Sequence, residues 1–339
     1  MNNQVAGLDL HKDQTYITVM GKDGQVLGEK VLKSKAGPIL NYLRNFDKPE
    51  VVFEATRNWY WLYDALQRED VEITMAHPKK TKAIGAARIK TDRIDSHTLA
   101  HLKRADLIPE SYLAPLETRE LRELLRHRIF LVRERAKVKS KIRTLLSKLN
   151  LICPKSDVLG KEAIIWLREN QKKMPEVFSD KLDDFLAVGG KLTEVIERTN
   201  AVIKREAEED EIVRLLKTIP GIGRFSAMLI KAEIGTISRF PDADHLASYC
   251  GLVPSTHSSG NYTHRGSITK EGNPWLRWVL TEATGKLKGK SKHFEDFYYR
   301  VLAKKTKKVA RVATARKLAV ALYYIWKRRE PFKEPKING

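Results

Sequence analysis

Three short β-rich runs open the chain, and this pattern restricts the fold more than any other feature. The runs read QVAGLDLH, QTYITVM and QVLGEKVLK, with short charged or glycine-containing turns between them. They predict a three-strand meander over residues 4–33. A meander followed by alternating helices and strands predicts an α/β domain with a mixed sheet. The later elements are expected as helices at 37–45, 58–69 and 86–104 and as strands at 50–55 and 71–77.

The middle of the chain is helical. Between Leu116 and Leu151, apolar residues recur at helical intervals among many arginines and lysines, which predicts a long basic amphipathic helix. After a break at Cys153 and Pro154, the helical pattern resumes to about residue 217. Two long helices joined by a turn predict an antiparallel coiled-coil arm, an oligomerisation interface, or both.

The charge of the chain favours a polyanionic partner. Lys and Arg number 63 against 42 Asp and Glu, which gives a formal charge of +21. Residues 286–317 are especially basic, and Glu295 and Asp296 are the only acids there, so this segment is expected to contact phosphates. No apolar run reaches the roughly 18 residues of a spanning helix. The start, MNNQVAGLDLHKD, has neither a basic leader nor an apolar signal core, so we expect a cytoplasmic protein without a membrane partner.

Cys153 and Cys250 lie far apart and outside any paired-ligand spacing, so the sequence predicts neither a disulfide scaffold nor a zinc site. Both are expected to be small core residues.

Four carboxylates stand out in this basic chain. Asp9 lies within the first predicted strand, and Glu54 lies near the end of another. Asp92 and Asp95 are three positions apart on a predicted helix, so they project from one face. Hard divalent cations prefer carboxylate oxygens, and two such ions about 4 Å apart can activate a nucleophile and stabilise a leaving oxygen. The combination predicts a site for Mg²⁺, with Mn²⁺ as the alternative.

A structural interpretation of the same acids stays open. An acid in a strand is usually on the solvated face, and Asp92 and Asp95 could form salt bridges with Arg88 and Arg93 instead of binding a metal.

The segment IPGIGRFSAMLI fits a helix-hairpin-helix. Gly221 and Gly223 would form a tight hairpin, and the helix that begins near Arg224 would offer free backbone amides to a phosphate. The alternative is an αα-turn with glycine at a close packing point.

The acidic residues also carry a family resemblance. GLDLHKD, FEAT and KTDRIDS resemble the Asp, Glu, Asp, Asp tetrad of the RuvC-like domain in DEDD transposases of bacterial insertion sequences, the bridge-RNA-guided recombinases. The resemblance implies an RNase H-like (RuvC-like) domain and makes Asp9, Glu54, Asp92 and Asp95 the metal ligands. We therefore expect three domains: a RuvC-like domain at 1–110, a helical coiled-coil region at 111–210, and a mainly α C-terminal domain with the helix-hairpin-helix at 211–339.

Residues 246–280 resemble the C-terminal transposase domain of the same family. They read LASYCGLVPSTHSSGNYTHRGSITKEGNPWLRWVL, and the part at 251–274, which contains Gly, Ser and Pro, is expected to be a loop. The resemblance implies that Ser259 is the nucleophile that forms a covalent phosphoserine link to DNA; without it, Ser-Ser-Gly is a common turn. His257 and His264 stay unassigned, since each could be a general base, a phosphate contact or a plain surface residue. The residues expected to hold DNA phosphates here are Arg265, Lys270 and Arg277.

These observations lead to one main function and two alternatives. The main hypothesis is a DNA recombinase that acts on donor and target DNA, chosen, as the resemblance implies, by a structured noncoding guide RNA. Because strand exchange must hold four ends at once, a homo-tetramer or a pair of dimers is expected. The alternatives are a structure-selective nuclease that hydrolyses DNA through two metals, and a non-catalytic nucleic-acid scaffold.

Overall fold

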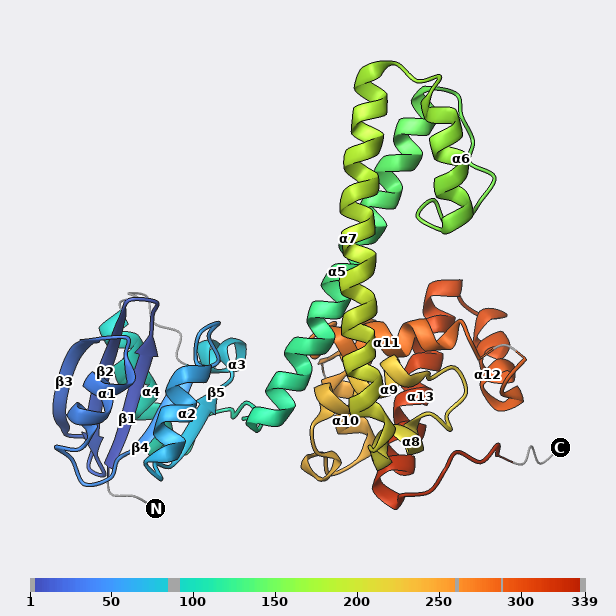
Figure 1. Ribbon diagram of the computed structural model, residues 1–339. Coiled ribbons are helices and arrows are strands. Elements are labelled where there is room, and N and C mark those ends of the chain that lie inside the picture. Colours follow the sequence, from blue (N-terminus) through green and yellow to red (C-terminus); the bar gives the residue numbers. More distant parts are fainter. Residues whose placement is uncertain (1–3, 85–91, 260–261, 288, 336–339) are drawn as a thin grey trace. The chain divides into compact units, whose positions relative to one another are not determined.

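The computed structural model describes residues 4–84, 92–259, 262–287 and 289–335, and only the backbone of residues 256–259 and 262–265. The chain divides into two compact units, Met1–Leu113 and Ala114–Gly339, which we describe separately (Figure 1). In the described part of the chain, no helix combines the length and the apolar character needed to cross a membrane.

A five-stranded mixed sheet forms the centre of the first unit. The strand order is β3-β2-β1-β4-β5; β2 pairs antiparallel with β1 and β3, and β4 pairs parallel with β1 and β5. This arrangement confirms the predicted mixed-sheet, RuvC-like domain. The strands are β1 (Gln4–Leu10), β2 (Gln14–Gly21), β3 (Val26–Lys33), β4 (Glu50–Glu54) and β5 (Ile73–Ala76).

Among the described residues of this unit, the helices beside the sheet are α1 (Ala36–Leu43), α2 (Tyr60–Arg68), α3 (Pro78–Ile84) and α4 (Asp92–Arg104). The short helix α3 was not predicted, since the sequence analysis assigned no element to that segment. The first part of the helix predicted at 86–104 lies outside the described residues.

The two faces of the sheet are covered by different helices. Side chains alternate along a strand, and Leu8 and Leu10 of β1 are buried with Ile39 of α1 and Leu62 of α2. Val5, on the opposite face of β1, packs in a second small cluster with Leu99 of α4. Side chains of β1 that point to the same side as Val5, including that of Asp9, therefore lie on the face that α4 covers.

Gly7 allows α4 to lie directly on the sheet. A Cβ atom at Gly7 would overlap the carbonyl oxygen of Ser96 and would lie 2.6 Å from the backbone nitrogen of Ala100. Two further contacts fix the helix: the hydroxyls of Thr18 and Ser96 are 2.9 Å apart, and Lys103 Nζ lies 2.5 Å from Glu50 Oε1. The N-terminal end of α4 is thereby held at the end of the sheet where β1 and β4 finish.

We expect Gly7→Ala to push α4 away from the sheet and to lower the free energy of unfolding of the first unit by about 1–3 kcal/mol, because the new methyl group meets rigid backbone atoms. Thermal unfolding and hydrogen exchange of the β1 and α4 amides would measure this effect. Gly37→Ala is the matched control, since a Cβ atom at Gly37 meets nothing within 4 Å. Equal stability of the two variants would contradict the prediction.

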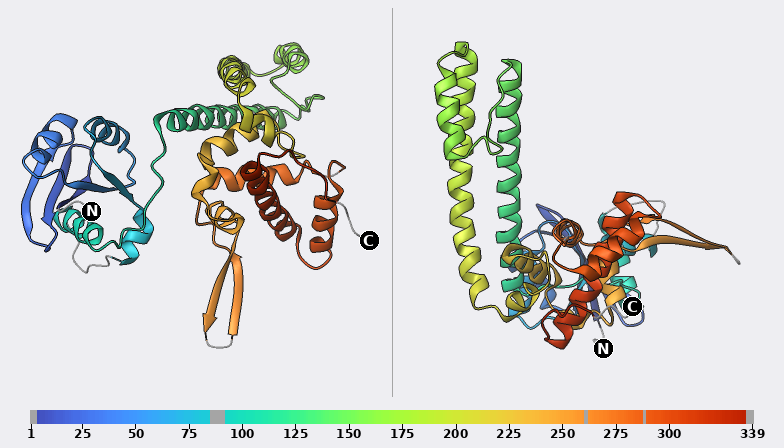
Figure 2. Two further views of the ribbon diagram at one scale, coloured as in Figure 1. Left: turned by 90° about the horizontal axis from the view of Figure 1, so that it is seen from below. Right: turned by 90° about the vertical axis from the view of Figure 1, so that its right-hand side faces the viewer.

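The second unit contains the predicted pair of long helices. Helix α5 (Leu116–Lys148) and helix α7 (Glu176–Glu208) run antiparallel and side by side, with α6 (Lys161–Gln171) between them in sequence (Figures 1 and 2). Near the far end, apolar residues of all three helices form a separate core, which includes Ile142, Leu167 and Leu182. We call this helical pair the arm.

The remainder of the second unit is a helical domain with its own core, which confirms the predicted helical C-terminal domain. Leu318, Leu322 and Trp326 of α13 are buried there against residues of the other helices. Cys250 is part of this core, and burial raises the pKa of its thiol to about 12. The helices are α8 (Glu211–Leu216), α9 (Arg224–Ile234), α10 (Ala243–Tyr249), α11 (Pro274–Thr284), α12 (Lys292–Leu302) and α13 (Lys307–Arg328).

The loop predicted at 251–274 is instead largely an antiparallel hairpin of β6 (Pro254–Ser259) and β7 (Tyr262–Ile268). It extends away from the helices (Figure 2). The loop prediction was wrong because the segment lacks the apolar alternation of a half-buried strand, whereas hydrogen bonding between backbones needs no apolar face.

Candidate active site

Asp9 and Glu54 lie at the same end of neighbouring strands. In the parallel pair of β1 and β4, Leu8 is level with Phe53, so the next residue of each strand, Asp9 and Glu54, reaches the same edge. Leu8 and Phe53 are both buried in the core on the α1 and α2 side. Because side chains alternate along a strand, both acids belong to the face that α4 covers.

Helix α4 brings the other two acids to this edge. Asp92 and Asp95 occupy its first turn, and the last turn is anchored at the opposite edge by Lys103 and Glu50. The pKa of Asp9 reflects this neighbourhood: burial raises it, the charge and hydrogen bond of His11 lower it, and the charges of Asp95 and Asp92 raise it again, with a net increase.

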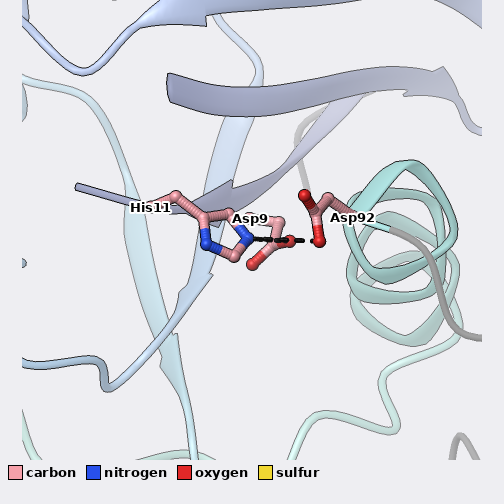
Figure 3. A group of neighbouring side chains, drawn as sticks. All are labelled: Asp9, His11 and Asp92. Carbon is pink, nitrogen blue, oxygen red and sulfur yellow. Dashed lines mark hydrogen bonds and ion pairs between the residues drawn. The ribbon is translucent and has the colours of Figure 1, made fainter. Parts of the chain in front are cut away.

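His11 contacts two of these carboxylates through one ring nitrogen. Its Nε2 atom is 3.0 Å from Asp9 Oδ2 and 3.3 Å from Asp92 Oδ1 (Figure 3). Burial lowers the pKa of His11, but Asp9 and Asp92 raise it by more. The sequence analysis did not assign His11. The available signal was its spacing of two residues from Asp9, which places both on one face at the end of a strand.

The donor atoms of Asp9, His11 and Asp92 are close enough to share one ion. One ligand atom from each lies within 4.8 Å of the others, and among the described residues these three form the compact group. Two carboxylates and one imidazole suit a divalent cation, and the carboxylate oxygens favour Mg²⁺ or Mn²⁺. Glu54 and Asp95 adjoin this group without belonging to it.

The sequence left open that Asp92 and Asp95 form salt bridges with Arg88 and Arg93 instead of binding a metal. The guanidinium group of Arg93 forms an ion pair with Glu29 of β3, at 2.5 Å between Nη2 and Oε2. Arg88 lies outside the described residues.

Ser259 is the last residue of β6 and pairs with Tyr262 across the hairpin. In the same ladder His257 pairs with His264. Ser259 belongs to the second unit and the four acids to the first.

The predicted hairpin turn of the helix-hairpin-helix connects α8 to α9. Gly221 has φ +79°, and a Cβ atom there would lie 2.8 Å from the carbonyl oxygen of Ala283, so this glycine serves both the turn and close packing. Gly223 is the residue before α9, and the space around its Cα is open. Arg224 is exposed at the start of α9. This end of α9 is therefore accessible to a phosphate.

Arg277 holds the chain that follows the hairpin. Its Nη1 atom donates to the carbonyl oxygen of Lys270 at 3.1 Å and to that of Cys250 at 3.5 Å. Lys270 has φ +53°, a left-handed backbone conformation that is energetically unfavourable for a residue other than glycine. The hydrogen bond from Arg277 stabilises this turn. The side chain of Arg265 is not described. The phosphate contacts predicted for these three residues remain predictions.

A buried acid that the sequence analysis missed connects the arm to the hairpin region. Glu233 of α9 is fully buried, and Arg126 of α5 donates two hydrogen bonds of 2.8 Å to its carboxylate. Asn273 donates to the same carboxylate at 2.7 Å, while its own oxygen accepts from the amides of Trp275 and Leu276. One carboxylate thus joins α5, α9 and the start of α11.

Comparison with known proteins places both units in one group. Residues 6–151 match a transposase family model of the IS110 DEDD type, and residues 213–299 match a model described as "Transposase IS116/IS110/IS902 family". The transposase for insertion sequence element IS1111A of Coxiella burnetii is 23% identical over 97% of this chain and 91% of its own length. The pilin gene-inverting protein of Moraxella bovis is 40% identical over 35% of this chain and 38% of its own length.

Among solved structures, Thermus thermophilus RuvC in complex with a Holliday junction substrate is 15% identical, with a TM-score of 0.27, over 32% of this chain and all of that chain. The two family models together match more than half of the chain: the first covers most of the first unit and the start of the second, and the other lies within the second unit. The chain therefore belongs to the IS110 family of transposases.

Proposed function

We propose that this transposase breaks and rejoins DNA strands through Ser259, and that Asp9, Glu54, Asp92 and Asp95 hold the divalent metal that assists the serine. The observation that carries the proposal is the shared position of the acids. The register of β1 and β4 puts Asp9 and Glu54 on one face and at one edge, and α4 begins at that edge with Asp92 and Asp95. Four carboxylates at one edge of the sheet repel one another unless a cation offsets their negative charge.

The chemistry assigned to Ser259 conserves the number of phosphodiester bonds. The serine hydroxyl loses its proton, and its oxygen forms a bond to the phosphorus atom while the bond between phosphorus and one bridging DNA oxygen breaks. That oxygen leaves as a hydroxyl group after it takes up a proton. The reverse reaction with the hydroxyl of another strand releases the serine and joins the new strand, so no nucleotide hydrolysis is needed.

A serine hydroxyl needs activation before it attacks. The metal, when bound, supplies a positive charge that lowers the cost of removing the serine proton and of forming charge on the phosphate oxygens. The carboxylates of this chain position that charge, and His11 fixes the orientation of Asp9 and Asp92 from one side. We propose Mg²⁺ as the ion, with Mn²⁺ as the alternative, because carboxylate oxygens suit both ions.

A structure-selective nuclease is the second candidate. It is favoured by one observation: Asp9, His11 and Asp92 lie within one compact unit to which Ser259 does not belong. Such an enzyme would hydrolyse DNA through water and leave free 5′-phosphate ends without rejoined product.

The proposal includes a structured noncoding guide RNA that selects donor and target DNA, and a homo-tetramer or pair of dimers that holds the four strand ends. The charge of +21 supports a second nucleic-acid partner beyond the DNA. We expect the protein purified from its native host to carry one discrete, structured RNA species, which sequencing of the bound RNA would identify. A broad mixture of cellular RNA fragments, or none, would contradict RNA guidance.

A further inference from the structure

Helices α11, α12 and α13 surround a cavity of about 420 Å³ (Figure 1 labels the three helices). It lies in the helical domain of the second unit, and neither the hairpin of Ser259 nor the helix-hairpin-helix contributes to its lining. A cavity of this size is large enough for a small ligand. Aromatic and basic side chains line it together, so its chemistry differs from that of a plain packing defect.

The α13 side of the cavity is basic. Lys307 and Arg311 are four positions apart and therefore point from the same face of the helix. The Nη2 atom of Arg311 donates to the carbonyl oxygen of Thr281 and to Glu282, both at 3.3 Å. Its Nε atom is buried and has no hydrogen-bond partner among the described residues. A buried guanidinium N–H without an acceptor is costly, and an anionic oxygen would satisfy it.

The α12 side of the cavity is aromatic. Phe294 is buried, whereas Tyr299 is 45% exposed. The rings of Tyr298 and Tyr299 lie edge to face with their centroids 5.4 Å apart. Exposed tyrosine rings beside cationic groups are the surfaces on which nucleic-acid bases stack. This wall therefore suits a planar base, and the opposite wall suits a phosphate.

The carboxylate of Glu295 makes the cavity better suited to a whole nucleotide than to a free phosphate ion. Its Oε2 atom accepts a hydrogen bond of 3.0 Å from the backbone amide of Gly289, so its carboxylate is held at the cavity. A negative charge there disfavours a free phosphate ion. The same carboxylate can accept a hydrogen bond from the exocyclic amino group of a base.

We propose that this cavity binds one unpaired nucleotide of a nucleic-acid strand, with its base against Tyr298 and Tyr299 and its phosphate at Lys307 and Arg311. The bound strand is either a DNA strand opened for exchange or an RNA, and both present the same base and phosphate chemistry. The inference does not depend on the role of Ser259, because none of the residues that carry it belongs to the proposed catalytic site.

Fluorescence anisotropy of the full chain with labelled single strands tests the proposal. The probes are single-stranded DNA and single-stranded RNA of mixed sequence, on the order of ten nucleotides long. We expect Tyr299→Ala to weaken binding of at least one probe by roughly tenfold through lost stacking. We expect Lys307→Gln to weaken it less and to reduce the slope of log affinity against log salt by about one unit, as one phosphate contact is lost.

The chain offers matched controls for both substitutions. Tyr324 is 43% exposed on α13 and lies outside the cavity lining, so Tyr324→Ala should leave binding unchanged. Lys308 neighbours Lys307 and is exposed, but it does not line the cavity, so Lys308→Gln is the control for Lys307→Gln. Tyr299→Phe keeps the aromatic face and should bind almost as the unmodified protein does. Circular dichroism verifies that each variant is folded.

Each outcome has a defined meaning. Weakening with the DNA probe alone assigns the site to a DNA strand, and weakening with the RNA probe alone assigns it to RNA. Unchanged binding of both probes by Tyr299→Ala would overturn the proposal, as would equal losses for Lys307→Gln and Lys308→Gln. As an independent readout, a photoreactive base in the probe should crosslink to the peptide that contains Tyr298 and Tyr299. Crosslinks confined to other segments would also overturn it.

Discussion

Ser259→Ala will form no denaturation-resistant protein–DNA adduct, and strand cleavage and rejoining will fall by on the order of a thousandfold or more. The reason is chemical: alanine has no oxygen to attack phosphorus, and removal of a nucleophile leaves only the catalysis supplied by binding and electrostatics. The measurement is a reaction with end-labelled DNA and Mg²⁺, stopped with detergent and separated on a denaturing gel. The adduct appears as labelled DNA that migrates with the protein.

Ser258→Ala is the matched control, since Ser258 is the preceding serine on the same strand, β6. It should keep both the adduct and the rejoined product. If Ser259→Ala still formed the adduct, another residue would be the nucleophile. If it cleaved DNA normally and the unmodified protein formed no adduct, the nuclease alternative would be favoured instead.

Asp9→Asn will lower Mg²⁺-dependent DNA cleavage by about a hundredfold or more, the scale of loss when a group that stabilises transition-state charge is removed. The substitution keeps the size of the side chain but removes the charge of the carboxylate, which is only 15% exposed and stands beside His11 and Asp92. A neutral amide is a weaker ligand for a hard cation. Cleavage rates over a Mg²⁺ titration, and direct titration of the free protein with Mn²⁺, measure the effect.

Asp47→Asn serves as the control for Asp9→Asn. Asp47 is exposed, and its backbone amide donates a hydrogen bond of 3.0 Å to the side-chain oxygen of Gln4 at the opposite end of β1. This variant should respond to Mg²⁺ as the unmodified protein does. A chain whose DNA binding and activity were indifferent to both Mg²⁺ and Asp9→Asn would be a scaffold, and the metal site would be rejected.

The two substitutions separate the proposed mechanisms. Loss of activity in Asp9→Asn with normal activity in Ser259→Ala would indicate metal-dependent hydrolysis through water. Loss in both would indicate that serine and metal act in one reaction.

Much of the fold followed from local patterns. The meander at 4–33 and the long helices α5 and α7 were predictable because their periodicity is carried by many residues in sequence. The hairpin of β6 and β7 was not, since its pairing is held by backbone hydrogen bonds between segments with no apolar alternation. The short helix α3 also carried too few residues for a periodic signal.

The candidate site was also predicted only in part from the sequence. The sequence pointed to Asp9, Glu54, Asp92 and Asp95 because acids are conspicuous in a basic chain and because two of them are spaced on one helical face. The spacing of two residues placed His11 on the same face as Asp9, but it did not indicate that the imidazole would also lie close to Asp92. Nor did the sequence indicate that Arg277 would donate a hydrogen bond to the carbonyl oxygen of Lys270.

By itself, the sequence determined the residue types and the local elements: a mixed sheet, a helical arm, a helical C-terminal domain and an acidic set suited to a divalent cation. Only the tertiary structure decided which groups meet. The register between β1 and β4 and the close approach of α4 at Gly7 place residues far apart in the chain at one edge of the sheet. Strand register and helix docking depend on the packing of whole faces, and that information is spread over the core and absent from any single motif.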